Sequence, residues 1–72
     1  MKATQAIPGL PPTARRALAR LGADISAARR RRRITSQELA ERAFTSRPTI
    51  SRIERGDPRV SIGIYAAVLF VL

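Results

Sequence analysis

Cysteine and histidine are both absent from this chain of 72 residues. Without cysteine there are no disulfide bonds and no thiolate chemistry, and without histidine the commonest metal ligand is missing. We therefore expect no metal site and no cofactor. Aromatic residues are also scarce, since the chain has one tyrosine and two phenylalanines. These are too few for the stacking platform of a single-strand-binding protein.

Acidic residues are few as well. Five acids stand against 14 basic residues, which gives a formal net charge of +9, and all but one of the basic residues are arginine. Such an excess predicts a polyanionic partner: nucleic acid, an anionic membrane surface or an acidic protein. Arginine in particular offers a planar fork that matches phosphate groups and guanine edges. The five acids fall at capping or pairing positions, so we expect a protein that is not an enzyme.

A hydrophobic run long enough to cross a membrane is also missing. The most apolar stretch, "VSIGIYAAVLFVL" at residues 60–72, has 13 residues, whereas spanning a bilayer takes roughly 20. The first residues, "MKATQAIPGLPP", lack the apolar centre of a signal peptide. A basic peptide lying on a membrane surface is disfavoured because the apolar run has no cationic face. We interpret it as a packing helix.

The pattern of the remaining residues predicts a compact all-α bundle of four to five helices. Prolines make residues 1–12 a flexible arm, and residues 13–72 form one domain. Apolar residues then recur at spacings of three and four, which is typical of amphipathic helices. The expected helices are one from a cap at Thr13 through Gly22 to about Arg32, a second in "SQELAERA" capped by Thr35 or Ser36, a third over 47–55 capped by Ser46, and a fourth from Ser61.

The second and third of these helices have the layout of a helix-turn-helix unit. In such a unit the second helix enters the DNA major groove and its N-terminal side chains reach base edges. Small Ala40 permits close packing of the two helices, and apolar residues such as Leu39 and Ile50 set their angle. The stretch "ITSQELAERAFTSRPTISRIERG", residues 34–56, resembles the Cro/repressor-type family, also called the xenobiotic-response-element family. Members of this family are all-helical bacterial DNA-binding domains.

The resemblance implies which residues contact DNA. Arg47, Pro48 and Arg52 fall at the main base-reading positions, and Arg52 is the best candidate for guanine because its fork matches the O6 and N7 acceptors. Arg55 and Arg59 lie near the groove edge and could hold backbone phosphates. The predicted DNA-binding residues are Ser36, Gln37, Ser46, Arg47, Pro48, Thr49, Ser51, Arg52 and Arg55.

The resemblance also implies a structural ion pair and reveals two departures. Glu54 is expected to pair with Arg29 on the first helix. Phe44 stands where the family usually has glycine in the turn. It either takes a left-handed backbone, at a cost of about 1–2 kcal/mol, or occupies a longer or reshaped turn with its ring on the core, so the angle between the two helices stays open. The family usually has a fifth helix, so the apolar surface near Leu72 is expected to be covered either by a partner subunit or by further residues of a longer chain. The residues predicted for a dimer or partner interface are Tyr65, Val68, Leu69, Phe70 and Leu72.

The segment "DPRVSIGIYAAVLFVL" further resembles HipB-like antitoxins, whose partners are HipA-like kinase toxins. The favoured hypothesis is therefore a homodimeric repressor that binds an inverted-repeat operator of double-stranded DNA, neutralises a HipA-like toxin and represses its own promoter. Such a protein would work in the bacterial cytoplasm at the nucleoid. Two alternatives stay open: a stand-alone repressor of phage or chromosomal type, and a toxin-neutralising module with little DNA role.

Overall fold

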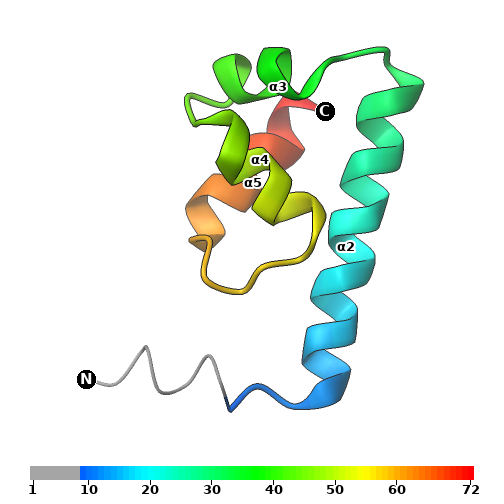
Figure 1. Cartoon of the computed structure of the whole chain (residues 1–72), viewed down its shortest axis with the longest axis vertical. Coiled ribbons are helices and arrows are strands. Elements are labelled where there is room, and N and C mark those ends of the chain that lie inside the picture. The colour runs from blue at the N-terminus through cyan, green and yellow to red at the C-terminus, as the bar shows by residue number, and fades with distance from the viewer. Residues whose placement is uncertain (1–8) are drawn as a thin grey trace.

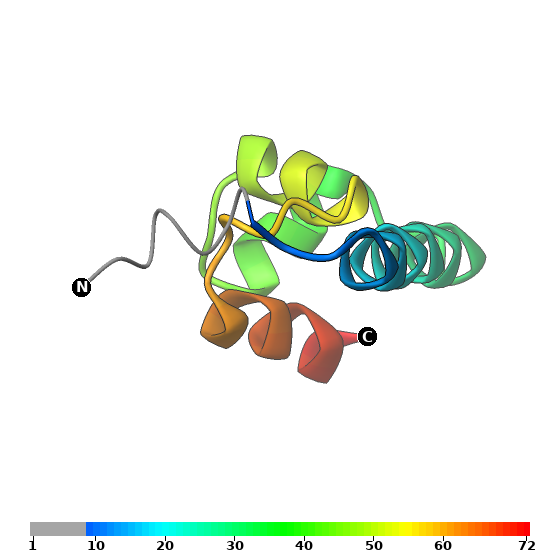
Figure 2. The same cartoon turned by 90° about the horizontal axis from the view of Figure 1, so that it is seen from below.

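The computed structural model describes residues 9–72, and within that range it contains four α-helices and no strand. They are α2 at Pro12–Arg31, α3 at Ser36–Arg42, α4 at Arg47–Glu54 and α5 at Ile62–Val71. Helix α2 runs along one side of the molecule and the three shorter helices gather against it (Figure 1). In the second view, α4 and α5 lie on opposite sides of the molecule (Figure 2). The predicted all-α bundle is confirmed.

The flexible arm predicted for residues 1–12 falls largely outside the described residues. Of that arm, residues 9–12 are described: Gly9, Leu10 and Pro11 lead directly into α2, and Pro12 is the first residue of that helix. The prediction that Thr13 caps this helix is wrong, because Pro11 occupies the N-cap position and α2 begins at Pro12. Proline suits the first helical position, since its fixed φ is helical and its missing N–H would have no partner there.

The other three helix starts are capped by hydroxyl side chains. At α3 the cap is Thr35, whose Oγ1 accepts a hydrogen bond from the Glu38 backbone at 3.0 Å, while Glu38 Oε1 accepts from the Thr35 backbone at 2.8 Å. This reciprocal pair is a capping box, and the hydrogen bond from Thr35 holds the pKa of the Glu38 carboxyl below its usual value. Ser46 and Ser61 accept from the third backbone N–H beyond them at the starts of α4 and α5.

Three helices also end in the same way, with one residue in the left-handed conformation. These residues are Arg33 after α2 (φ 57°), Phe44 after α3 (φ 56°) and Gly56 after α4 (φ 74°). In each case two backbone N–H groups bond back to the last turn, the arrangement of a Schellman motif. At α3, for example, Phe44 donates to Glu41 and Thr45 donates to Ala40. A left-handed backbone costs a residue other than glycine about 1–2 kcal/mol, so the ends of α2 and α3 carry strain that α4 avoids.

Of the two forms that the sequence leaves open for the turn at Phe44, the structure shows the left-handed one, and the ring does not lie on the core. The turn keeps the short form that a glycine would give it, and Phe44 adopts the left-handed backbone itself. Phe44 is 97% exposed, while the preceding residue, Ala43, is buried in the core. The turn is therefore not reshaped, and the angle between α3 and α4 is set without help from this ring.

The core lies where all four helices meet. Its fully buried side chains are contributed by α2, α3, α4 and α5: Ile25, Leu39, Ile50, Ile53 and Val68. The core is completed by Ile34 between α2 and α3, Ala40 of α3, Ala43 at the C-cap of α3, and Tyr65 of α5. The Tyr65 hydroxyl donates to the Asp57 backbone carbonyl at 2.8 Å, so the one polar group of this ring is satisfied.

This burial corrects part of the predicted interface. Tyr65 and Val68 are 2% and 0% exposed and pack within the chain's own core, so they do not form an outer surface. Leu69 and Phe70 are exposed and Leu72 is partly buried. Because α5 is apolar on every side, its sequence does not distinguish the buried face from the outer one. No helix within residues 9–72 combines the length and hydrophobicity needed to span a bilayer.

Helix α2 runs without a break through Gly22, as expected, and the structure shows why glycine is suited to that position. A β-carbon on Gly22 would lie 2.5 Å from the Ile53 carbonyl oxygen and 2.7 Å from that of Glu54. Gly56, which follows the C-cap of α4, lies in the same contact, and a β-carbon on it would lie 2.5 Å from the Leu18 carbonyl oxygen of α2. The C-terminal end of α4 therefore packs backbone against backbone on α2.

We predict that Gly22→Ala lowers the free energy of unfolding by about 1–3 kcal/mol, because the added methyl overpacks a contact made by rigid backbone. Gly63→Ala is the matched control. A β-carbon at Gly63 meets no atom closer than 4.0 Å, and alanine improves helix propensity by up to about 1 kcal/mol. Urea denaturation of both variants measures the difference, and equal stabilities would contradict the proposed backbone contact.

Candidate nucleic-acid interface

The outer face of α4 is formed by five residues that all project from the core. Ile50 and Ile53 point inward and are fully buried, so the helical period of 3.6 residues turns the intervening positions outward. The exposed residues of α4 and its C-cap are Arg47, Pro48, Ser51, Arg52 and Arg55. Three of the five are arginine and none is acidic. The face is thus a cationic ridge on a short helix.

Two open hollows flank this ridge. One lies toward α3 and is lined by Ser36, Arg47, Pro48 and Ser51. Residues from the start of α3 and the start of α4 therefore meet in one place, as the helix-turn-helix prediction requires. Gln37, next to Ser36, is exposed and its amide donates to Glu41 Oε2 at 3.1 Å on the same helix.

The second hollow lies toward the loop between α4 and α5. Arg52 and Thr49 border it from α4, and the residues that line it from the loop and α5 are Asp57, Arg59, Val60, Ser61 and Ile64. Arg52 and Arg47 therefore point to opposite sides of the ridge. Asp57 was not among the predicted DNA-binding residues, so its place in this hollow was missed. In the sequence, the dipeptide Asp57-Pro58 indicates a turn but does not indicate contact with a ligand.

Hydrogen bonds hold part of the ridge in place. Arg55 Nη1 donates to Ser51 Oγ at 2.7 Å, one helical turn back, so the Arg55 side chain lies along the helix. The Ser46 and Thr49 hydroxyl oxygens are 2.9 Å apart, and Ser46 also accepts from the Thr49 backbone. Ser46 is therefore engaged as a cap, while Arg47 and Arg52 extend as exposed side chains.

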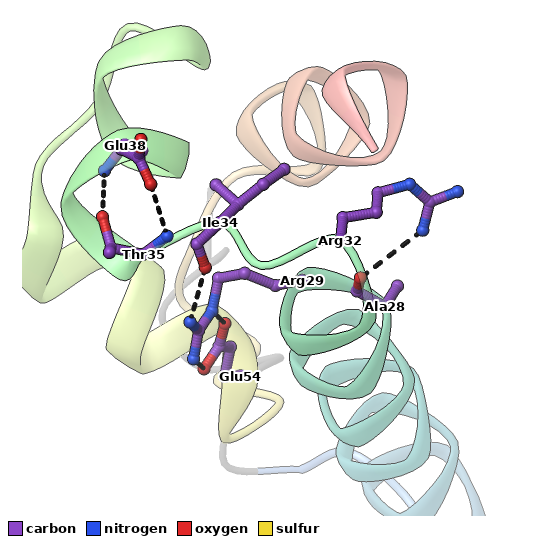
Figure 3. A network of polar contacts seen from close by, with 7 residues as sticks. All are labelled: Ala28, Arg29, Arg32, Ile34, Thr35, Glu38 and Glu54. Atoms are coloured by element: carbon purple, nitrogen blue, oxygen red, sulfur yellow. Dashed lines mark hydrogen bonds and ion pairs between the residues drawn. The ribbon is translucent and has the colours of Figure 1, made fainter.

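The ion pair expected between Arg29 and Glu54 is present and joins α2 to α4 (Figure 3). Arg29 donates through Nε to Glu54 Oε2 at 2.7 Å and through Nη2 to Oε1 at 3.3 Å. Its third nitrogen, Nη1, donates to the Ile34 carbonyl oxygen at 2.9 Å. The hydrogen bonds to Glu54 raise the pKa of Arg29. One side chain thereby fixes α2, the segment before α3 and the ridge-bearing helix relative to each other.

Residues 20–72 match the family described as helix-turn-helix domain. Because that match covers most of the chain, the protein belongs to this family, and α3, the Phe44 turn and α4 are its helix-turn-helix unit. Such units are DNA-binding modules. Searches of curated proteins and of solved structures returned no significant match.

We predict that Glu54→Gln lowers the free energy of unfolding by about 3 kcal/mol. The side chains of the pair are 13% and 14% exposed, and removing one partner leaves a largely buried charge without its counterion. Glu41→Gln is the control, since it removes an exposed carboxylate that bonds only to Gln37 among the described residues. Chemical denaturation should separate the two variants; a loss as small as that of Glu41→Gln would mean that solvent replaces the pair.

Proposed function

We propose that this protein is a transcriptional repressor that binds duplex DNA in a sequence-specific manner, with α4 in the major groove. The observation that carries the proposal is the cationic ridge, which has three arginines, no acid and a hollow on each side. A helix fits the width of the major groove. The hollows would face the two phosphate backbones that border the groove.

The ridge supports a division of roles among its residues. Arg52 and Arg47 are exposed and border opposite hollows of the ridge, so their forks can reach base edges, with guanine favoured by its O6 and N7 acceptors. Pro48 has no backbone N–H and reads shape or a thymine methyl. Contacts to phosphate position the protein without reading sequence. The residues proposed for this role lie at the ridge margin or beyond it: Ser36, Gln37, Ser51 and Arg55.

A single ridge contacts few base pairs, so the proposal includes a homodimer on an inverted repeat. Two copies would place their α4 helices in successive major grooves, about one helical turn apart. The exposed apolar side chains of α5 support this step, since Phe70 is 91% exposed and Leu69 is 48% exposed. Contact through these residues would remove apolar area from water.

Within this proposal we favour an antitoxin that binds a HipA-like kinase toxin and represses its own promoter in the bacterial cytoplasm. Its support is the resemblance of residues 57–72 to HipB-like antitoxins. A stand-alone repressor shares the DNA contacts and lacks the toxin. A module that only neutralises a toxin through α4 would bury Arg47 and Arg52 against protein. Retardation of upstream DNA in a gel would exclude this last alternative, and a kinase-like reading frame beside the gene would favour the antitoxin.

For the base contact, we predict that Arg52→Ala weakens binding to the preferred duplex by about 1–3 kcal/mol and relaxes preference at one base position. The duplex is selected from a random pool with the wild-type protein, and affinities are measured by fluorescence anisotropy. Arg20→Ala, on the exposed side of α2, is the matched control because it removes the same charge. If the two variants lose affinity equally on all sequences, Arg52 is a phosphate contact and not a base reader.

For the dimer, we predict that Phe70→Ser shifts the protein to monomer in sedimentation equilibrium and reduces binding to an inverted repeat more than to a half-site. Phe44→Ser is the control, since Phe44 is as exposed as Phe70 but lies in the turn after α3. Phe44→Ser therefore shows the effect of losing an exposed aromatic ring outside α5. A monomeric wild type, or equal effects of both variants, would refute dimerisation through α5.

A further inference from the structure

Hydrogen bonds through its backbone N–H, its backbone carbonyl and its carboxylate hold Asp57 at the edge of the α4 ridge. Its backbone N–H donates to the Arg52 carbonyl at 3.0 Å, and its own carbonyl accepts from the Tyr65 hydroxyl at 2.8 Å. Its carboxylate Oδ1 accepts from the Arg59 backbone N–H at 2.9 Å. The residue thus connects α4, the loop and α5, and it lines the second hollow.

The same carboxylate oxygen orients the Arg59 side chain. Arg59 Nε donates to Asp57 Oδ1 at 3.3 Å, while the Arg59 side chain is 76% exposed. Within residues 9–72 the hydrogen bond of this guanidinium uses Nε, so both terminal nitrogens remain available to an outside acceptor. A guanidinium held at Nε presents its two terminal N–H groups as a fork suited to two oxygens of a phosphate.

The charges of the hollow favour an anion of one unit charge. Arg52 and Arg59 each bring one positive charge and Asp57 brings one negative charge, so the three residues sum to one positive charge. Hydrogen bonding from the Arg59 backbone N–H holds the pKa of Asp57 below its ordinary value, so the carboxylate is ionised at neutral pH. A phosphodiester of the DNA backbone carries one negative charge, which would neutralise the net positive charge of these three residues.

We infer that Asp57 is a positioning residue that holds the Arg59 fork toward a backbone phosphate on the α5 side of the ridge. This inference rests on the proposed function, since it takes α4 to lie in the groove. A phosphate at the second hollow would then be bound by Arg59 and flanked by Arg52. An acidic residue near DNA ordinarily weakens binding by repulsion; here its orienting effect on Arg59 outweighs that repulsion.

The direction in which Asp57→Asn changes the affinity for DNA tests the inference. Asp57→Asn raises the formal net charge from +9 to +10, and charge alone would therefore strengthen binding. Its amide oxygen can still accept from the Arg59 backbone, but it lacks the negative charge that makes the hydrogen bond from Arg59 Nε charge-assisted and holds the guanidinium in place. We expect a weakening of about two- to fivefold, the effect of an exposed ion pair, and by the same factor on a selected duplex and on a scrambled duplex of the same composition. Tighter binding by Asp57→Asn would overturn the inference.

Arg59 variants show whether Asp57 acts through that side chain. Arg59→Ala should reduce the slope of log affinity against log salt concentration by about 0.9, the value of one phosphate contact. Arg59→Lys should keep the slope and lose affinity, because lysine retains the charge and lacks the fork. In an Arg59→Ala background, Asp57→Asn should no longer weaken binding. An unchanged slope in Arg59→Ala, or a persistent loss in the double variant, would contradict the positioning role.

The experiment separates this inference from the proposed function. If the wild-type protein retards no duplex at low salt, the proposed function itself fails. If the wild type binds and Arg52→Ala loses sequence preference while both Arg59 variants match the wild type, DNA binding stands and the role of Asp57 and Arg59 is refuted. The Arg59 side chain is exposed, so its substitution should leave the fold intact, and circular dichroism checks this for each variant.

Discussion

The geometry of the cationic ridge depends on one guanidinium group. Arg29 donates two hydrogen bonds to Glu54 and a third to the Ile34 carbonyl, and so links α2, α4 and the segment that leads into α3. Because the fork is planar and rigid, it constrains direction as well as distance. The same pair keeps Glu54, the single acid of α4, off the outer face, so an internal stabilising contact also leaves that face without a negative charge.

Much of this arrangement could be predicted from residue pattern. The spacing of Ile50 and Ile53 identified the buried side of α4, and the serine and threonine positions identified three of the four helix starts. The ion pair followed from resemblance to the Cro/repressor-type family. These features are local or tied to a motif, so short stretches of sequence contain the information that specifies them.

Other features depend on packing that the sequence does not reveal. Helix α5 is apolar throughout, and only the direction in which it meets the core separates buried Tyr65 and Val68 from exposed Phe70. Phe44 and Arg33 have side chains that disfavour the left-handed backbone, yet both adopt it because the helix ends require that turn. Asp57 contributes through contacts to both neighbouring helices and to Arg59, and those partners come together only in the folded chain.

The meeting of Gly22 and Gly56 has a consequence for how such a domain can change over time. The height of α4 above α2 is set by peptide groups, since a side chain at either glycine would collide with backbone. Residues on the solvent side of α2 take no part in that spacing. Mutation can therefore alter the charge on the solvent side of α2, apart from the paired Arg29, while the distance between α4 and α2 stays the same.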